Sequence, residues 1–423
     1  MRQQSYLPTL SAVTQRLTFW LGAIIVGFVI VAMTLLSEWA AQTYRLLSIQ
    51  YNWFNFVIPP IGLGLTAWIT FRFFPGSERS GIPQVKTALE TSFTLKERAR
   101  LGSFNIAVGK LFLPIMGLLS GASVGFGGPA VHIGASIMLS AGKIVKFPPH
   151  YMEKGLILAG SAAGFAAMFN APLAGIIFAI EEMGRTLEEK IGSLVLTAII
   201  LSGVTAYALL NNRIYFADES LLMPLGENWL AVPLCGLIGG ILGGLFSKVT
   251  IIGSQFFNRR KIPIVAIAVF CGGIIAIVNY YSNGATIGTG YQQTKAILQG
   301  AQTMEPAFPF YKMIATWATF FSGIPSGIFV PSLATGAGIG VDLAIWVPIA
   351  PMSVMILLSM TAYFSGMLQS PLTSFVIVME MTNSHEILIA LMATAFIAAG
   401  VSKIIHPRPL YLALTDGYKL PKK

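Results

Sequence analysis

Charged residues are scarce in this sequence. Only 10% of its 423 residues are Asp, Glu, Lys or Arg, whereas 55% are hydrophobic and the mean hydropathy is +0.72. A soluble domain carries about 25% charged residues, so this chain has too little polar surface to cover a body of this size in water. The shortage excludes a soluble globular protein and predicts a membrane protein.

Cysteine is almost absent as well. Cys235 and Cys271 are the two cysteines, and both fall in apolar segments. This number excludes a framework of several disulfides, and the spacing matches no metal-binding pattern. We interpret both as packing residues and expect neither a metal nor a cofactor.

Long apolar runs are abundant instead. A membrane-spanning helix needs about 20 mostly apolar residues, and six runs qualify: 17–39, 54–74, 191–210, 229–252, 262–281 and 387–405. The first run is too long for the apolar region of a signal peptide, so we interpret it as a retained span. Other apolar stretches are interrupted by Gly and Pro.

The formal net charge of +10 does not indicate nucleic-acid binding, because the basic residues fall in short loops and tails between apolar runs. Membrane proteins keep such residues on the cytoplasmic side. The N-terminal tail, 259–261 and the C-terminal lysines are basic, whereas the 213–229 segment is acidic. We therefore expect both termini in the cytoplasm and that segment outside, in a multi-pass protein of the inner or plasma membrane.

Two pairs of segments repeat within the chain. GASVGFGGPAVHIGA at 121–135 matches GIPSGIFVPSLATGA at 323–337 without gaps, 202 residues later. FAAMFNAPLAGIIFAIE at 165–181 matches FSGMLQSPLTSFVIVME at 364–380, 199 residues later. The charge pattern places the two halves in opposite orientations. We predict an inverted repeat of tilted and broken helices, with halves at 1–212 and 229–423 and an extracytoplasmic connector at 213–228.

Each copy of the first motif is a Gly-rich turn that leads into a helix with Pro in its first turn. A helix that begins inside the membrane presents unpaired N–H groups and a positive dipole end, which favour an anion. A third such start is Arg79-Ser80-Gly81-Ile82-Pro83. A bare ion in a medium of low dielectric costs tens of kcal/mol, and one helix dipole returns about 2 kcal/mol. Several helix starts must therefore converge on one anion; the alternative is that these motifs only allow close helix packing.

Taken together, these motifs resemble those of the CLC chloride channel and transporter family. RSGIPQ at 79–84 resembles GSGIP, GFGGP at 125–129 resembles GREGP, and GIFVP at 327–331 resembles GxFxP. APLAGIIFAIEEM, SPLTSFVIVMEMT and RPLY at 408–411 also resemble family segments, in the same order. The resemblance implies an all-helical membrane fold, a chloride site in each subunit, and a homodimer with one pore per subunit in the lipid bilayer.

The resemblance also implies which residues bind the anion. Ser80 and Tyr411 would supply hydroxyls, and Gly81 and Ile82 belong to the same helix start as Ser80. Backbone N–H groups would complete the site, in its centre from Ile328 and Phe329 and on its outer side from Phe126, Gly127 and Gly128.

One departure from the family pattern dominates our functional prediction. The Glu of GREGP is the family's outer gate and, in exchangers, its proton carrier, but here Gly127 occupies that position. We therefore predict passive conduction of small anions, chiefly chloride, without proton coupling. The alternative is a Cl⁻/H⁺ antiporter that uses another acid such as Glu182, which matches the family's inner proton-transfer position.

An enzyme is the alternative from a different functional class. Gly121-Ala122-Ser123-Val124-Gly125 fits the G-x-S-x-G nucleophile pattern. However, the repeat places Pro325 where Ser123 stands, and no strand precedes the motif. We expect no enzymatic activity, and therefore no catalytic residue.

Overall fold

The computed structural model describes residues 10–90, 102–145, 151–184, 192–210, 215–216, 223, 226–259, 262–300 and 306–418. Throughout these residues the regular elements are helices, which confirms the predicted all-helical class. They are α1 Leu10–Gln50, α2 Phe54–Phe73, α3 Ile82–Leu89, α5 Phe104–Leu119, α6 Gly127–Ile144, α7 Tyr151–Phe169, α8 Pro172–Phe178, the π-helix η1 Ala179–Met183, α9 Gly192–Leu209, the 3₁₀-helix η2 Glu227–Leu230, α10 Ala231–Arg259, α11 Ile264–Tyr281, α12 Tyr291–Leu298, α13 Phe308–Phe321, α14 Phe329–Trp346, α15 Met352–Leu368, α16 Pro371–Thr382, α17 Leu388–Ile405 and α18 Leu410–Thr415.

Among the described residues, six helices are long and apolar enough to cross a membrane. Five of them, α1, α2, α10, α11 and α17, contain or closely match runs predicted from hydropathy. The sixth, α14, was not predicted as a span because its sequence contains Gly and Pro. The predicted run at 191–210 forms α9, an apolar helix of 18 residues.

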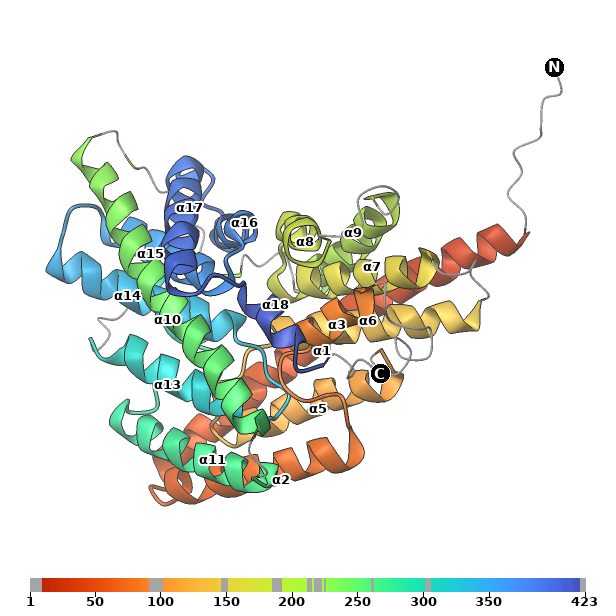
Figure 1. Ribbon diagram of the computed structural model, residues 1–423, viewed down its shortest axis with the longest axis horizontal. Coiled ribbons are helices and arrows are strands. Elements are labelled where there is room, and N and C mark those ends of the chain that lie inside the picture. The colour runs from red at the N-terminus through yellow and green to blue at the C-terminus, as the bar shows by residue number, and fades with distance from the viewer. Residues whose placement is uncertain are drawn as a thin grey trace.

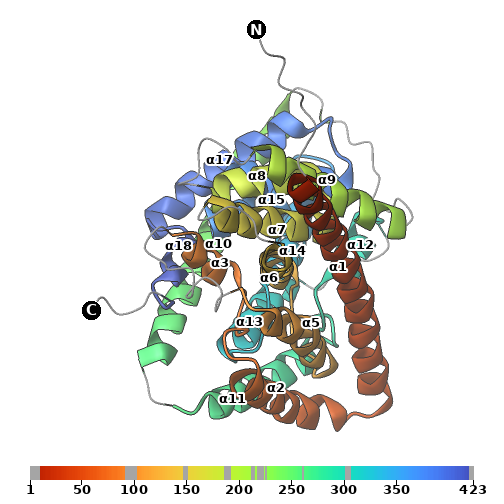
Figure 2. The ribbon, with the colours of Figure 1, turned by 90° about the vertical axis from the view of Figure 1, so that its right-hand side faces the viewer.

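Several helices are too short to span a bilayer. α3 and α12 have eight residues each and α18 has six. An eight-residue helix is only about 12 Å long. Figures 1 and 2 place α3 and α18 beside each other within the protein. Of these short helices, α3 is a broken helix that the sequence predicts.

The short helices α3 and α12 correspond to each other in the two halves of the chain. Gly81 precedes α3 with a φ of 100°, and Gly290 precedes α12 with a φ of 91°. Both values lie in the left-handed region, which glycine adopts without strain. The sequence RSGIPQVKTAL therefore matches GTGYQQTKAIL at 288–298, a third repeated block that sequence analysis missed.

The two halves also pack in the same way. α6 lies against α7, and α14 against α15 (Figure 1). A side chain at Gly134 of α6 would collide with the Gly160 carbonyl oxygen, and one at Gly336 of α14 would approach Met360 Cα to 2.7 Å. Small residues let membrane helices approach this closely. The predicted division at 213–228 stays a prediction, because most of that connector lies outside the described residues.

Two glutamates join the halves reciprocally. The Glu181 carboxylate accepts hydrogen bonds from the N–H groups of Leu372 (3.1 Å) and Thr373 (2.7 Å) at the start of α16. The Glu380 carboxylate accepts from Leu173 (2.9 Å) and Ala174 (2.7 Å) at the start of α8. Each carboxylate satisfies orphan donors of the other half's helix and matches its positive dipole end. These matched residues therefore have a structural role.

The charged segments on which the topology prediction rests are only partly described. The basic tails at 1–9 and 419–423 lie outside the described residues, as do Arg260, Lys261, and the connector residues Arg213, Asp218 and Glu219. The multi-pass membrane architecture agrees with the spans above. The sidedness of the termini stays a prediction.

Candidate anion site

Three irregular segments converge at the centre of the protein. Gly125 and Gly327 exchange two backbone hydrogen bonds of 2.9 and 2.6 Å, which join the two copies of the repeated motif. The N–H of Arg79 donates to the carbonyl of Ile324, and the Arg79 carbonyl accepts from the N–H of Ser326, both at 3.2 Å. The residues before α3, α6 and α14 therefore meet in one place.

The starts of α6 and α14 offer backbone donors at this point. In α6 the first helical hydrogen bond runs from the Ala130 N–H to the Phe126 carbonyl (2.8 Å), and in α14 from Ser332 to Ile328 (3.0 Å). The N–H groups that precede Ala130 and Ser332 have no acceptor within their own helices. The backbone ligands predicted from the sequence all lie at these two starts: Phe126, Gly127, Gly128, Ile328 and Phe329.

Two hydroxyl groups lie next to these helix starts. The side chains of Ser80 and Tyr411 are 0% and 1% exposed, and neither hydroxyl has a hydrogen-bond partner among the described residues. The two hydroxyls lie beside each other. Gly128 lies directly against Ser80, and the ring of Phe329 is 5.7 Å from that of Tyr411. An unpaired buried hydroxyl costs about 1–3 kcal/mol, so this pair is well suited to an anionic acceptor.

A buried lysine that sequence analysis missed lies next to the site. The Lys110 ammonium is 0% exposed and donates to the carbonyls of Ser77 (2.9 Å) and Arg79 (2.8 Å). A side chain at Gly81 would lie 3.0 Å from Lys110 Cε, so the cation lies directly behind the start of α3, next to Ile82. The Arg79 side chain is directed to Asn258 and not to the helix start, because its guanidinium donates to the Asn258 side-chain oxygen at 2.9 Å.

The second half repeats this lysine. Lys312 is 0% exposed and donates to the carbonyls of Thr286 (2.9 Å) and Gly288 (2.7 Å), just before α12. Lys110 and Lys312 are 202 residues apart, the spacing of the first repeated motif. A search for identical residues at that spacing would have found them. The repeated arrangement shows that these lysines stabilise the turn before a broken helix.

Aromatic rings enclose the rest of the site. Phe329 is the centre of this group, and five rings lie within 6.4 Å of its own: Phe165, Phe169, Phe178, Phe364 and Tyr411. The positive edges of such rings can face an anion, while their bulk keeps water out. Sequence analysis did not predict that these rings meet, because they lie in segments far apart in the chain.

Gly127 leaves little free space at the position of the family's gating glutamate. A Cβ atom there would lie 3.0 Å from Phe329 Cδ2 and 3.1 Å from Phe169 Cζ. Contacts this short require the neighbouring rings to move. The phenyl rings of Phe169 and Phe329 thus occupy the surroundings that a longer side chain at Gly127 would need.

A buried carboxylate lies near the tyrosine hydroxyl. Glu182 is 2% exposed, and its two oxygens accept hydrogen bonds from Ser370 Oγ (2.6 Å) and Lys86 Nζ (2.5 Å). It lies close enough to Tyr411 for its charge to act on the phenol. The residue belongs to η1, a π-helical turn, and such turns occur frequently at functional sites. Unlike its neighbour Glu181, Glu182 does not cap a helix.

The serine of the G-x-S-x-G pattern has no catalytic partner among the described residues. The Ser123 hydroxyl shares a hydrogen bond with Thr316 Oγ1 (3.0 Å), and its N–H donates to Thr319 Oγ1 (3.0 Å). Both partners lie on α13, so these contacts connect the motif to the second half. His132 lies against Gly81 instead. The geometry gives the hydrolase alternative no support.

The comparisons with known proteins agree with this arrangement. The family model described as "Voltage gated chloride channel" matches residues 62–403. A relative from Vibrio vulnificus strain YJ016, the H⁺/Cl⁻ exchange transporter ClcA, is 28% identical over 366 residues, which are 82% of this chain and 76% of the relative. The same transporter from strain CMCP6 matches equally well.

Solved structures with the same fold include two antiporters. A slow cyanobacterial Cl⁻/H⁺ antiporter has a TM-score of 0.81 at 22% identity and covers 97% of this chain and 98% of its own. A CLC-type fluoride/proton antiporter has a TM-score of 0.76 at 21% identity, with coverages of 96% and 99%. A eukaryotic CLC transporter has a TM-score of 0.78 at 20% identity, with coverages of 97% and 75%.

These relatives contradict our prediction of passive conduction. ClcA is an exchange transporter, and two of the solved structures are proton antiporters. The prediction was wrong because it drew a conclusion about the whole proton route from a single position, Gly127. A route needs titratable groups somewhere along its length. The resemblance itself is confirmed: the chain belongs to the family of voltage-gated chloride channels, the CLC family.

Proposed function

We propose that this protein exchanges chloride for protons across a membrane. The observation that carries the proposal is Glu182, a buried carboxylate beside the unpaired hydroxyl of Tyr411 in a chain 28% identical to an H⁺/Cl⁻ exchange transporter. An acid within the membrane part of a protein indicates function, because burying it is costly. Glu182 is therefore the group that exchanges protons with the inner side.

The anion binds between the hydroxyls and the helix starts described above. Ser80 and Tyr411 donate from one side, and the N–H groups of Ile328 and Phe329 from the other. The N–H groups at Phe126, Gly127 and Gly128 form its outer side, while Gly81 and Ile82 position Ser80. Support comes from the two unpaired hydroxyls and from the convergence of three helix starts. Partial charges hold an anion weakly enough for release, and Lys110 lies behind the site.

At the outer end of the proton route another residue must supply the acid, because position 127 is a glycine. Glu38 of α1 is the described carboxylate that the geometry favours. It lies within electrostatic range of Tyr215, whose ring is 6.0 Å from that of Phe169, the residue that covers Gly127. Glu38 and Tyr291 also line one small pocket. Glu38 is half-buried, so it can exchange protons with water.

A flux measurement in proteoliposomes tests the exchange. Vesicles loaded with concentrated chloride are diluted into a low-chloride buffer with valinomycin, while a chloride electrode and a pH electrode record the same sample. Chloride efflux should then drive protons into the vesicles at a fixed ratio, even against a proton gradient. Chloride efflux that moves no protons would refute the exchange.

Variants then locate the proton route. Glu182→Gln should lower proton flux by roughly 100-fold or more, the usual effect of losing a proton-transfer group, while chloride still moves. Glu38→Gln should do the same if it is the outer acid. Glu386→Gln, an exposed carboxylate, is the matched control and should keep the wild-type ratio. A normal ratio in Glu182→Gln would exclude this residue as the inner acid.

The same proposal includes the assembly and the topology. We propose a homodimer with one pore per subunit, in the inner or plasma membrane, with both termini in the cytoplasm. Halves at 1–212 and 229–423 are related as inverted repeats, an arrangement that the matched lysines and matched glutamates support. Ser123 has no catalytic role in it, and the protein is not an enzyme.

A further inference from the structure

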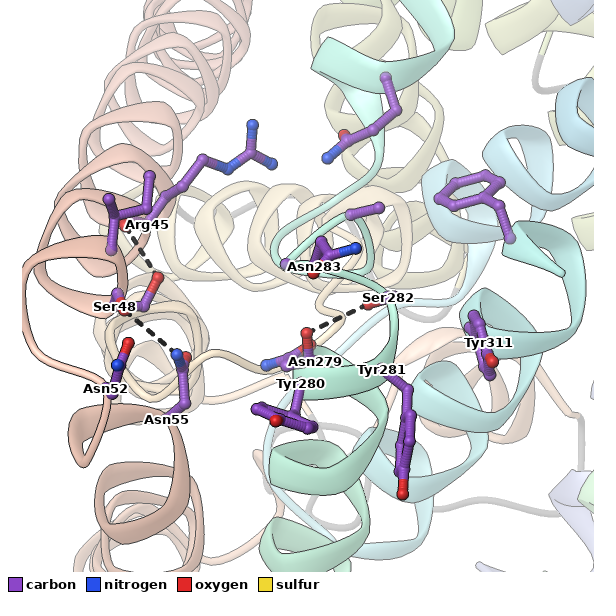
Figure 3. Close-up of a pocket in the computed structure, with 15 residues that line it drawn as sticks. Arg45, Ser48, Asn52, Asn55, Asn279, Tyr280, Tyr281, Ser282, Asn283 and Tyr311 are labelled. Carbon is purple, nitrogen blue, oxygen red and sulfur yellow. Dashed lines mark hydrogen bonds between the residues drawn. The ribbon is translucent and has the colours of Figure 1, made fainter. Parts of the chain in front are cut away.

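A large polar pocket lies away from the anion site, between the end of α1, the start of α2, the end of α11 and the start of α13 (Figure 3). Its volume is about 850 Å³. In the proposed topology this end of α1 faces the extracytoplasmic side. The pocket is far too large for one chloride ion, since a water molecule fills about 30 Å³. It therefore fits an organic molecule.

The charges around the pocket favour an anion. Fifteen described residues line it; among these, Arg45 carries the one charge and none is a carboxylate. The guanidinium is half-buried and has no hydrogen bond or ion pair within the described part of the chain. Lys312 lies within electrostatic range of this guanidinium. Guanidinium groups bind phosphate and carboxylate oxygens in pairs.

The remaining walls favour hydroxyl groups on that anion. Amide side chains from three helices and two turns line the pocket, including Asn52, Asn283 and Gln293. Two further amides are held in place: Asn279 donates to the Gly121 carbonyl (3.0 Å), and Asn55 donates to the Ser48 carbonyl (3.2 Å). Amides both donate and accept, as the hydroxyls of a polyol do. The walls are therefore already arranged to bind such a ligand.

The surroundings place this pocket at the membrane surface. Tyr280 and Tyr281, on its wall, are 58% and 63% exposed, and Trp53, between Asn52 and Asn55 in the chain, is 57% exposed. Exposed Tyr and Trp are typical of the headgroup level of a bilayer. Ile49, also on the wall, is 74% exposed. Anionic phospholipids, whose headgroups are phosphate esters of glycerol, lie at this depth.

We propose that the pocket binds a glycerol phosphate group, with its phosphate on Arg45 and its hydroxyls on the asparagines. The group can belong to an anionic lipid such as phosphatidylglycerol or to a soluble glycerol phosphate, because both present the same chemistry. Asn279 of the pocket wall donates to the Gly121 carbonyl, and the Gly288 N–H donates to the Ala122 carbonyl at 3.2 Å. Both carbonyls belong to the Gly-rich turn before α6. An occupied pocket thus stabilises the loop that leads to Gly125.

Two binding measurements on the full chain in detergent distinguish the sources. Native mass spectrometry counts the molecules retained from phosphatidylglycerol and from phosphatidylcholine. Thermal unfolding measures the rise in Tm on adding glycerol 3-phosphate, because a ligand of the folded state stabilises it. Preferential retention of phosphatidylglycerol identifies the lipid, whereas a Tm rise without retention identifies the soluble ester. Neither effect in the wild type would overturn the proposal.

Two variants and one control locate the site. Arg45→Gln should weaken binding by at least about tenfold, since it removes a charge-assisted contact. Asn283→Asp adds a repelling charge to the pocket, and its φ of 49° suits Asp as well as Asn. Arg72→Gln, an exposed arginine on α2, should bind as the wild type does. Equal losses in Arg45→Gln and Arg72→Gln would overturn the proposal, and none of these results depends on transport.

Discussion

Replacing Tyr411 with Phe removes one hydroxyl from the proposed anion site and leaves its ring in place. The hydroxyl is buried, lies beside that of Ser80, and has no partner among the described residues. A hydrogen bond to a charged partner contributes about 1.5–3 kcal/mol. Because about 1.4 kcal/mol corresponds to a tenfold change, the Kd for chloride should rise roughly 10- to 150-fold.

The same change should stabilise the protein when chloride is absent. The wild-type hydroxyl is then buried without an acceptor, which costs about 1–3 kcal/mol. Tyr411→Phe removes this cost, so its Tm without chloride should be higher than that of the wild type. The rise in Tm on adding chloride should be smaller in the variant, because weaker binding stabilises the folded state less. The Tm without chloride should thus rise while the stabilisation by chloride falls. This pair of opposite changes distinguishes a residue that binds the anion from one that only supports the fold.

Isothermal titration with chloride and thermal unfolding measure both effects. Tyr363→Phe is a matched control, because Tyr363 is also fully buried and its hydroxyl also lacks a partner among the described residues. It packs against Phe246 on α10, with the rings 6.1 Å apart. The control should keep the wild-type affinity for chloride. A Kd in Tyr411→Phe within twofold of the wild type would refute the assignment of this hydroxyl.

Three further changes test other parts of the structure. Gly127→Ala should lower the stability by about 1–3 kcal/mol through crowding of the phenyl rings, whereas Gly155→Ala, where nothing lies within 4 Å, should not; equal Tm values would contradict the close contacts. Lys110→Met should weaken chloride binding while Lys312→Met leaves it unchanged, as measured by titration; equal losses would mean that the charge acts only through folding. Glu181→Gln should lower the stability by about 1 kcal/mol through its weaker helix cap yet keep the chloride-to-proton ratio, and a changed ratio would place this residue on the proton route.

The helical membrane architecture could be predicted because its cause is local. A run such as 262–281 is apolar enough to be a span whatever surrounds it, and α11 forms there at Ile264–Tyr281. Helix α14 was predicted to start at this motif but was not predicted as a span, because its glycines and Pro331 interrupt the apolar run. Pro331 lies in the first turn of the helix, where its missing N–H costs nothing.

The candidate site shows the same limit more clearly. Ser80, Gly127 and Tyr411 could be identified because each lies in a short contiguous motif. Lys110 has its match in Lys312, and the Phe165, Phe169 and Phe178 rings lie in the repeated block 165–181, but neither pattern tells what these side chains contact. Their role arises from contacts with residues far away in the sequence.

The sequence alone determined that this chain is a membrane protein, that it contains a repeat, and where its helix starts offer N–H groups to an anion. These properties follow from hydropathy, motif spacing and backbone chemistry, which do not depend on contacts with residues far away in the sequence. Only the tertiary structure decided that the three starts meet, that Glu181 caps a helix while the adjacent Glu182 binds Lys86 and Ser370, and that phenyl rings crowd Gly127. Adjacent residues point in different directions, so their roles depend on what the fold brings against them.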